Sequence, residues 1–286
     1  MQHEQFIIKI SCPATSGIVA SVTSFLSEHG CYISEMSQFD DELSGRFFMR
    51  AVFRFNTGLD GDIDLIERGF VDVAGKFDMD WELHSTAQPM RVLLMVSKFD
   101  HCLSDLLYRY HKGEMDMQIT AIVSNHLDLR PMAEREGIRF IYLPVNHDNK
   151  AQQEAELMNI IEDTGTELVV LARYMQILSD DLCKKLAGRA INIHHSFLPG
   201  FKGAKPYQQG FDRGVKLIGA TAHYVTSDLD EGPIIEQDVA RVDHSLTPEE
   251  LTARGRDTEC MVLARAVKWH CEHRVVLNGS KTVVFQ

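Results

Sequence analysis

The 286-residue chain lacks a surplus of basic residues and lacks any long uninterrupted hydrophobic run. Its formal net charge of −12 argues against a protein whose main task is to bind the phosphate backbone of a nucleic acid. No apolar stretch approaches the ~20 residues that a membrane-spanning helix needs. Residues 1–4 also lack the charged and apolar regions of a signal peptide. We therefore expect a cytoplasmic protein without a nucleic-acid or membrane partner.

Cysteine pairs and glycine-rich turns are also missing where redox and cofactor sites need them. The six cysteines form no C-x-x-C pair, so we expect reduced and mostly buried thiols. The turn at residues 97–102, which follows the first expected strand of the second half, contains no glycine. A nicotinamide, flavin or P-loop site is therefore not expected at this turn.

The composition that is present suits two ordinary globular domains. Hydrophobic residues make up 44% of the chain and charged residues 24%, which is enough for a sizeable core. A short polar passage at residues 85–89 separates two different patterns, and we interpret it as a linker. The predicted domains are residues 1–85 and residues 86–286.

The first domain has the predicted order strand, helix, strand, strand, helix, strand. Apolar residues recur at helical spacing from Ile18 to Leu26, with Ser16 expected as the N-cap and Gly30 as the C-cap. This order is the split βαβ or ferredoxin-like arrangement, an α+β fold. The strands are expected at residues 6–10, 31–39, 46–55 and 79–83, and the second helix at residues 62–76.

This domain resembles the ACT domain, a small regulatory module attached to amino-acid and one-carbon enzymes. The resemblance is carried by Cys12-Pro13, residues 17–20 and residues 28–33. It implies an amino-acid effector and a homo-oligomer. ACT loops usually have an acidic residue soon after the proline, whereas residues 14–16 here are Ala-Thr-Ser. A structural or dimer-forming role therefore stays open beside ligand sensing.

Beyond Met90, strands and helices alternate, which predicts a doubly wound, mostly parallel sheet of the α/β class. The unbroken apolar run at residues 168–171 is typical of a parallel strand that is covered on both faces. The expected strands are at residues 90–96, 119–123, 138–143, 168–171, 190–193 and 239–242. The expected helices are near residues 103–110, 129–136, 152–164, 180–186 and 247–270, before a terminal hairpin with strands at 275–277 and 282–285.

Three polar residues stand out at the ends of apolar runs in the second domain. Asn192 and His194 close the run that starts at Ala190, and Asp230 ends a polar loop. Open α/β sheets place their sites at the carboxyl ends of strands, and an amide, an imidazole and a carboxylate together suit carbonyl chemistry. Each also has a structural interpretation. His223 would complete a metal site with two of them, but ligand spacing such as H-E-x-x-H is absent, so we expect no metal.

Residues 90 to 240 resemble the folate-dependent formyltransferase family. The matching motifs are Asn192-Ile193-His194 with Ser196-Phe197-Leu198-Pro199, residues 171–179, and residues 228–235. The resemblance implies a Rossmann-like formyltransferase domain in which Asn192, His194 and Asp230 are catalytic. It also implies that the folate substrate contacts Tyr174, Met175, Gln176, Ile177, Leu178, Val225, Asp228 and Leu229. His195 and Lys202 are candidate supporting residues, each with a structural or solvent-exposed alternative.

Within this family, an ACT-like domain ahead of the formyltransferase domain resembles the formyltetrahydrofolate deformylases of one-carbon and purine metabolism. That resemblance implies hydrolysis of 10-formyltetrahydrofolate to formate and tetrahydrofolate, with the folate as substrate and no cofactor. Asn192 and His194 would stabilise the formyl oxyanion, while Asp230 would assist His194 and water. The alternatives are formyl transfer to an amine, which needs a second substrate pocket, and a non-catalytic folate or amino-acid sensor.

Overall fold

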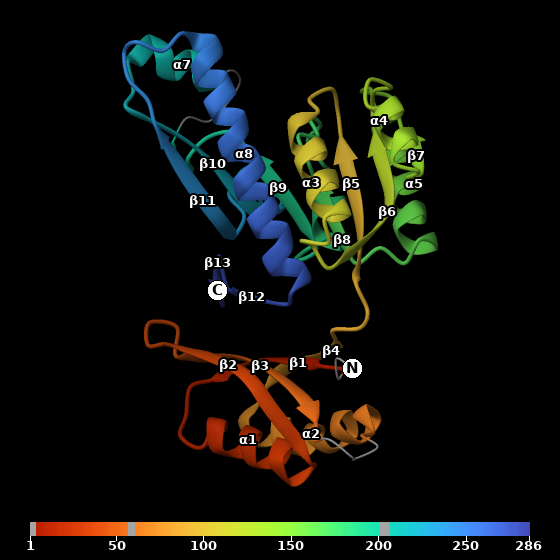
Figure 1. Ribbon diagram of the computed structural model, residues 1–286, viewed down its shortest axis with the longest axis vertical. Helices are drawn as coiled ribbons and strands as arrows, with labels where there is room; N and C mark the ends of the chain where they lie inside the picture. Colours follow the sequence, from red (N-terminus) through yellow and green to blue (C-terminus); the bar gives the residue numbers. More distant parts are fainter. Residues whose placement is uncertain (1–3, 57–60, 201–205) are drawn as a thin grey trace. The chain divides into compact units, whose positions relative to one another are not determined.

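The computed structural model describes residues 4–56, 61–200 and 206–286, which form two compact units (Figure 1). The first unit comprises Met1–Pro89, His273–Asn278 and Val283–Gln286, and the second comprises Met90–Glu272 and Gly279–Thr282. The boundary thus lies at residue 89, whereas we expected it at residue 85. The segment after residue 85 stays with the first unit because the backbone N–H and the hydroxyl of Thr86 both donate to the carbonyl of Gln5. Most of the terminal segment also belongs to the first unit, where Asn278 donates to Asp41 at 2.7 Å.

The first unit has the ferredoxin-like order that the sequence predicted. Its four strands form an antiparallel sheet in the order β2-β3-β1-β4, and α1 and α2 pack on one face of that sheet (Figure 1). The elements are β1 Phe6–Pro13, α1 Ile18–Glu28, β2 Cys31–Asp41, β3 Arg46–Phe55, α2 Ile63–Phe77 and β4 Asp80–Ser85.

The start of α1 differs from the prediction. Gly17 is the N-cap residue in the left-handed conformation, and no side chain caps the helix, so the expected cap by Ser16 was wrong. Because β1 continues to Pro13, only four residues remain to reverse the chain, and a glycine is suited to the required positive φ of 91°. By contrast, Asp62 caps α2 by accepting from the N–H groups of Asp64 and Leu65.

The second unit contains a seven-stranded sheet in the order β11-β10-β9-β8-β5-β6-β7. Five of these strands run parallel, whereas β10 is antiparallel to β9 and β11 is antiparallel to β10. The elements of this unit are β5 Met90–Val96, α3 His101–His111, β6 Met117–Ser124, α4 Arg130–Arg135, β7 Phe140–Tyr142, α5 Lys150–Asp163, β8 Leu168–Leu171, α6 Asp180–Lys185, β9 Ala190–His194, α7 Pro206–Arg213, β10 Leu217–Tyr224, β11 Ile234–Arg241 and α8 Pro248–Cys271. The chain ends in a separate two-stranded hairpin, in which β12 Val275–Asn278 belongs to the first unit and β13 Lys281–Val284 is divided between the two units.

Helices cover both faces of this sheet, as a doubly wound fold requires. α5 and α6 bury Leu157, Ile161 and Leu182 against one face, in a core with residues of β5, β8 and β9. On the other face α8 packs over β9, β10 and β11 and against α3. α8 begins with the capping box that the sequence indicated, in which Thr247 accepts from Glu250 N–H and Glu250 accepts from Thr247 N–H. The prediction did not include α7.

The strand order creates a switch point between β5 and β8. From β5 the chain proceeds to β6 and β7 on one side and later to β8 and β9 on the other. In open α/β sheets, ligands bind outside the carboxyl ends of the strands at such a point. His194 ends β9, and the segment from Arg173 follows β8, so the predicted site residues gather at this edge of the sheet.

The described part of the chain contains no helix that combines the length and apolar composition needed to cross a bilayer.

Candidate active site

His194 and Asp230 form an ion pair at the end of β9. Nδ1 of His194 lies 3.2 Å from Oδ2 of Asp230, and both side chains are largely buried. Nε2 of His194 is buried and has no hydrogen-bond partner among the described residues. The carboxylate therefore orients the imidazole by one nitrogen and leaves the other nitrogen for a bound molecule.

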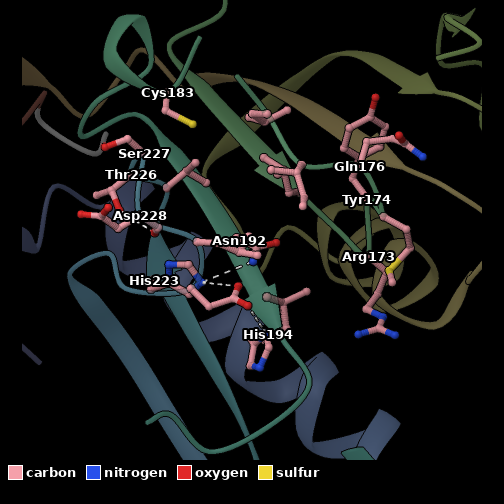
Figure 2. Close-up of a pocket in the computed structure, with 18 of the residues that line it drawn as sticks. Arg173, Tyr174, Gln176, Cys183, Asn192, His194, His223, Thr226, Ser227 and Asp228 are labelled. Atoms are coloured by element: carbon pink, nitrogen blue, oxygen red, sulfur yellow. Dashed lines mark hydrogen bonds and ion pairs between the residues drawn. The ribbon is translucent and has the colours of Figure 1, made fainter. Parts of the chain in front are cut away.

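Asn192 pairs with His223, a residue that the sequence suggested only for a metal site. The two residues stand opposite each other in the β9–β10 register, and Nδ2 of Asn192 lies 3.3 Å from Nε2 of His223. Nδ1 of His223 lies 2.9 Å from the carbonyl of Tyr224, which can only accept, so Nδ1 carries a proton. When Nε2 of His223 carries no proton, it accepts from Asn192, and the second N–H of the amide stays available. Figure 2 shows this contact beside His194.

Asp230 is held as an anion by the two histidines. Burial alone would raise the pKa of this carboxyl group, but hydrogen bonds and charge from His194 and His223 outweigh burial and hold the pKa well below its usual range. Nε2 of His223 is 3.8 Å from Oδ1 of Asp230, so His194 is the closer partner. Asp230 also has a positive φ of 57°, a conformation that aspartate tolerates better than most residues.

A cavity of about 370 Å³ opens against these residues (Figure 2). Asn192, His194, His195, His223 and Asp230 line it from β9, β10 and the adjoining loops. All eight residues that the family resemblance assigned to substrate binding also line it, and their contact with a folate stays a prediction. They are Tyr174, Met175, Gln176, Ile177, Leu178, Val225, Asp228 and Leu229. Lys202, the remaining candidate, lies outside the described residues.

The wall that follows β8 is anchored to the end of β5. Ser97, directly after β5, accepts a 3.0 Å hydrogen bond from the backbone N–H of Met175 and donates a 2.7 Å bond to Asn125. The turn at residues 97–102 lacks the glycines of a nucleotide-binding turn. Through Ser97 it instead positions the segment that carries Tyr174 and Gln176.

The loop after β9 is anchored by Thr221 of β10. The hydroxyl of Thr221 donates to the carbonyl of Ser196 at 2.9 Å and accepts from the N–H of Leu198 at 3.1 Å. Gln237 of β11 donates both to this hydroxyl and to the carbonyl of Leu198. This largely buried network keeps the chain after His194 and His195 in one conformation.

Arg173 and Glu259 form a second polar group beside the cavity, and the sequence analysis assigned neither of them. Arg173 donates to Nδ1 of His195, and its Nε lies 3.3 Å from Oε2 of Glu259. Glu259, on α8, is only 1% exposed, and it also accepts from Tyr207 and from His101. The partners of Glu259 stand on α3, α7 and the segment after β8, so no local sequence pattern could have revealed the group.

Gly232 lets the chain return from Asp230 to β11, and we expect Gly232→Ala to destabilise the second unit. A Cβ atom there would lie 1.7 Å from the carbonyl oxygen of Tyr224 and 3.2 Å from Nδ1 of His223. Forced overpacking of this kind costs ~1–3 kcal/mol or more, so the thermal unfolding midpoint should fall. Gly75→Ala is the matched control, because a Cβ at Gly75 meets no atom within 4 Å. An unchanged midpoint for Gly232→Ala would contradict this account.

Comparison with known proteins agrees with the geometry. The formyl transferase family model matches residues 90–267. The chain is 52% identical over 285 residues to a formyltetrahydrofolate deformylase of Corynebacterium sp. strain P-1, covering 100% of this chain and 99% of the relative. The chain belongs to the formyltetrahydrofolate deformylase family. It is also 47% identical to the deformylase of Bacillus subtilis strain 168, over 96% of this chain and 92% of the relative.

Solved structures separate the deformylase family from its transferase neighbours. A formyltetrahydrofolate deformylase from Burkholderia mallei ATCC 23344 has a TM-score of 0.95 and 56% identity, and covers 99% of this chain and 100% of its own. A glycinamide ribonucleotide transformylase from Symbiobacterium toebii has a TM-score of 0.66 and 27% identity. It covers only 72% of this chain but 98% of its own. The deformylase structure thus covers both units, whereas the transformylase structure covers only part of the chain.

Proposed function

We propose that this chain hydrolyses 10-formyltetrahydrofolate to formate and tetrahydrofolate. Membership of the deformylase family over the entire chain supports the reaction. The observation that supports the location of the active site is that Asn192, His194 and Asp230 meet at one cavity, which is otherwise lined by largely apolar groups. An apolar cavity with a few convergent polar groups suits a pterin ring with a reacting formyl group.

Asn192 and His194 stabilise the oxyanion in this proposal. As the oxygen of water bonds to the formyl carbon, the carbonyl electron pair moves onto the formyl oxygen. The free N–H of Asn192 donates to that oxygen without changing charge. Nε2 of His194, which is buried and unpartnered among the described residues, donates the second bond when the ring is protonated.

Asp230 receives the proton that water loses and stabilises the charge on His194. The carboxylate is ionised before the reaction, so it can take this proton directly or through a second water molecule. The bond between the formyl carbon and N10 then breaks, and N10 takes from Asp230 the proton that water lost, so that the carboxylate is regenerated as tetrahydrofolate leaves. Formic acid loses its proton to solvent, so the net reaction consumes one water and needs no cofactor or metal.

Formate release without an amine acceptor tests the reaction. We expect purified protein to release formate and tetrahydrofolate in equal amounts from 10-formyltetrahydrofolate in buffer alone. Product formation only after an amine is supplied would make the chain a transferase, and folate binding without turnover would make it a sensor. Either of these two results would overturn the proposed hydrolysis.

The first unit serves as an ACT-type regulatory module in this proposal. Its ferredoxin-like sheet and the residues quoted above support the assignment. An amino-acid effector would bind this unit, and the protein would act as a cytoplasmic homo-oligomer. Thermal unfolding with glycine or methionine at millimolar concentrations tests the effector, and sedimentation tests the oligomer. No shift in the unfolding midpoint with either amino acid, or a monomer, would contradict the corresponding part.

A further inference from the structure

His195 is the one member of the His-His pair that the proposed reaction leaves unused, yet it lines the cavity. Its ring lies nearly parallel to the ring of His194, with centroids 5.2 Å apart and an interplanar angle of 23°. The centroid of the Tyr207 ring lies 6.2 Å from that of His195, with the two rings tilted. The His195 ring thus lies directly beside the catalytic histidine.

The contact with Arg173 determines which nitrogen of His195 carries the proton. Nη1 of Arg173 and Nδ1 of His195 are within hydrogen-bonding distance. A guanidinium group can only donate, so Nδ1 is the acceptor and carries no proton. The neutral ring therefore carries its proton on Nε2. Among the described residues, no side chain or carbonyl accepts a hydrogen bond from this Nε2–H, which leaves it for a bound molecule.

Arg173 is itself held in place by the buried carboxylate of Glu259. Its Nε lies 3.3 Å from Glu259, and its guanidinium carbon lies 5.2 Å from the centroid of the Phe99 ring. Both oxygens of Glu259 are occupied, Oε1 by Tyr207 and Oε2 by His101 and Arg173. Arg173 also has a positive φ of 65°, which is uncommon for a long side chain. A buried cation in such a backbone conformation indicates a position that the surrounding structure determines strictly.

The surroundings keep His195 neutral at assay pH. Burial and the adjacent charge of Arg173 lower the pKa of His195 to about 4, and the charge of His194 lowers it further. The negative charges of Glu259 and Asp230 raise this pKa but do not outweigh the other effects. The ring is therefore a fixed neutral donor that does not switch between pH 5 and pH 8. Such a group is suited to hold a reactant and not to transfer a proton.

We infer that His195 is a further catalytic residue of the proposed hydrolysis, where its Nε2–H holds the attacking water, and that Arg173 and Glu259 are positioning residues acting through it. A water molecule in a cavity needs two or more polar partners. His195 donates to the water oxygen and Asp230 accepts one of its protons, so the water is oriented. His195 gains and loses no proton in this step, and the bonds formed and broken are those of the proposed hydrolysis.

Glutamine and asparagine at position 195 test the inference. The amide nitrogen of glutamine reaches the position of Nε2–H, whereas asparagine reaches only the position of Nδ1. We expect His195→Gln to keep most of the parental kcat for formate release. His195→Asn should lower kcat by about 10- to 100-fold, the loss expected for one hydrogen bond to a reacting group, with KM nearly unchanged because water is not bound in competition with folate. His147→Gln is the control, since that side chain is fully exposed.

Four results would overturn the inference while leaving the proposed hydrolysis intact. These are parental kcat in His195→Asn, equal losses in both folded variants, a larger loss in His195→Gln than in His195→Asn, and a loss expressed only in KM. A parental protein that releases no formate would instead overturn the proposed function first.

Two further measurements complement the His195 variants, and the first of them needs no variant at all. Long-range ¹H–¹⁵N correlation spectra of the parental protein should show Nε2 of His195 protonated and Nδ1 unprotonated, and the reverse would overturn the inference. Arg173→Lys should lower kcat in the parental background but add little in His195→Asn, because a positioning residue acts through His195. Additive losses would overturn the role of Arg173.

Discussion

Asp230→Asn should lower kcat for formate release by about 10³- to 10⁴-fold, the scale seen when a buried carboxylate that orients a catalytic histidine is replaced by its amide. The substitution keeps the size of the side chain but removes the charge that lies 3.2 Å from Nδ1 of His194. It also removes the group that receives the proton from water. KM for the folate should change little, because this charge matters chiefly as the oxyanion forms.

The control for Asp230→Asn is Asp257→Asn, which removes one exposed carboxylate from α8 and should leave kcat and KM unchanged. Thermal unfolding of both variants shows whether the second unit is intact. Asp230→Asn protein that is folded and keeps more than a tenth of the parental kcat would contradict the role given to this carboxylate.

Asn192→Ala should lower kcat by about 10²- to 10³-fold, the usual loss for one oxyanion donor. Two consequences follow from the structure. The formyl oxygen loses a neutral N–H donor, and Nε2 of His223 loses its 3.3 Å partner and turns more readily towards Asp230. Steady-state formate release measures the effect, and the loss should be in kcat more than in KM.

Asn159→Ala is the matched control, because this asparagine lies on the exposed side of α5 and its side chain donates to Glu156, away from the cavity. We expect it to have parental kinetics. If Asn192→Ala were folded and retained parental turnover, another donor would have to stabilise the oxyanion. The backbone of the loop after His195 would then be the first place to search.

Much of the fold could be predicted because its signals are local. Helical spacing from Ile18 to Leu26, the apolar run of β8 and the Thr247 capping box each lie within a few neighbouring residues. Apart from α7 and from β10, which was given no bounds, the order of elements in both units was therefore predicted with boundaries that differ by a few residues. The end of β1 and the cap of α1 were wrong, because the paired strand β3 extends β1 to Pro13 and leaves Gly17 to make the turn.

The antiparallel placement of β10 and β11 could not be predicted in the same way. Each strand is recognisable by itself, but its direction depends on the path of the chain through the loops and α7 between β9 and β10. That direction brings His223 opposite Asn192. A sequence pattern shows neither the register nor the pairing, so His223 could be suggested only for a metal site.

The sequence by itself indicated the two-domain order, the class of each domain and, through the family motifs, Asn192, His194 and Asp230, which the structure brings to one cavity and whose catalytic roles stay a prediction. Only the tertiary structure decided how these residues are supported. The contact between Asn192 and His223 spans 31 residues and that between Arg173 and His195 spans 22. Helix periodicity and caps act over three or four residues, whereas these contacts depend on strand register and on helices packing across a sheet.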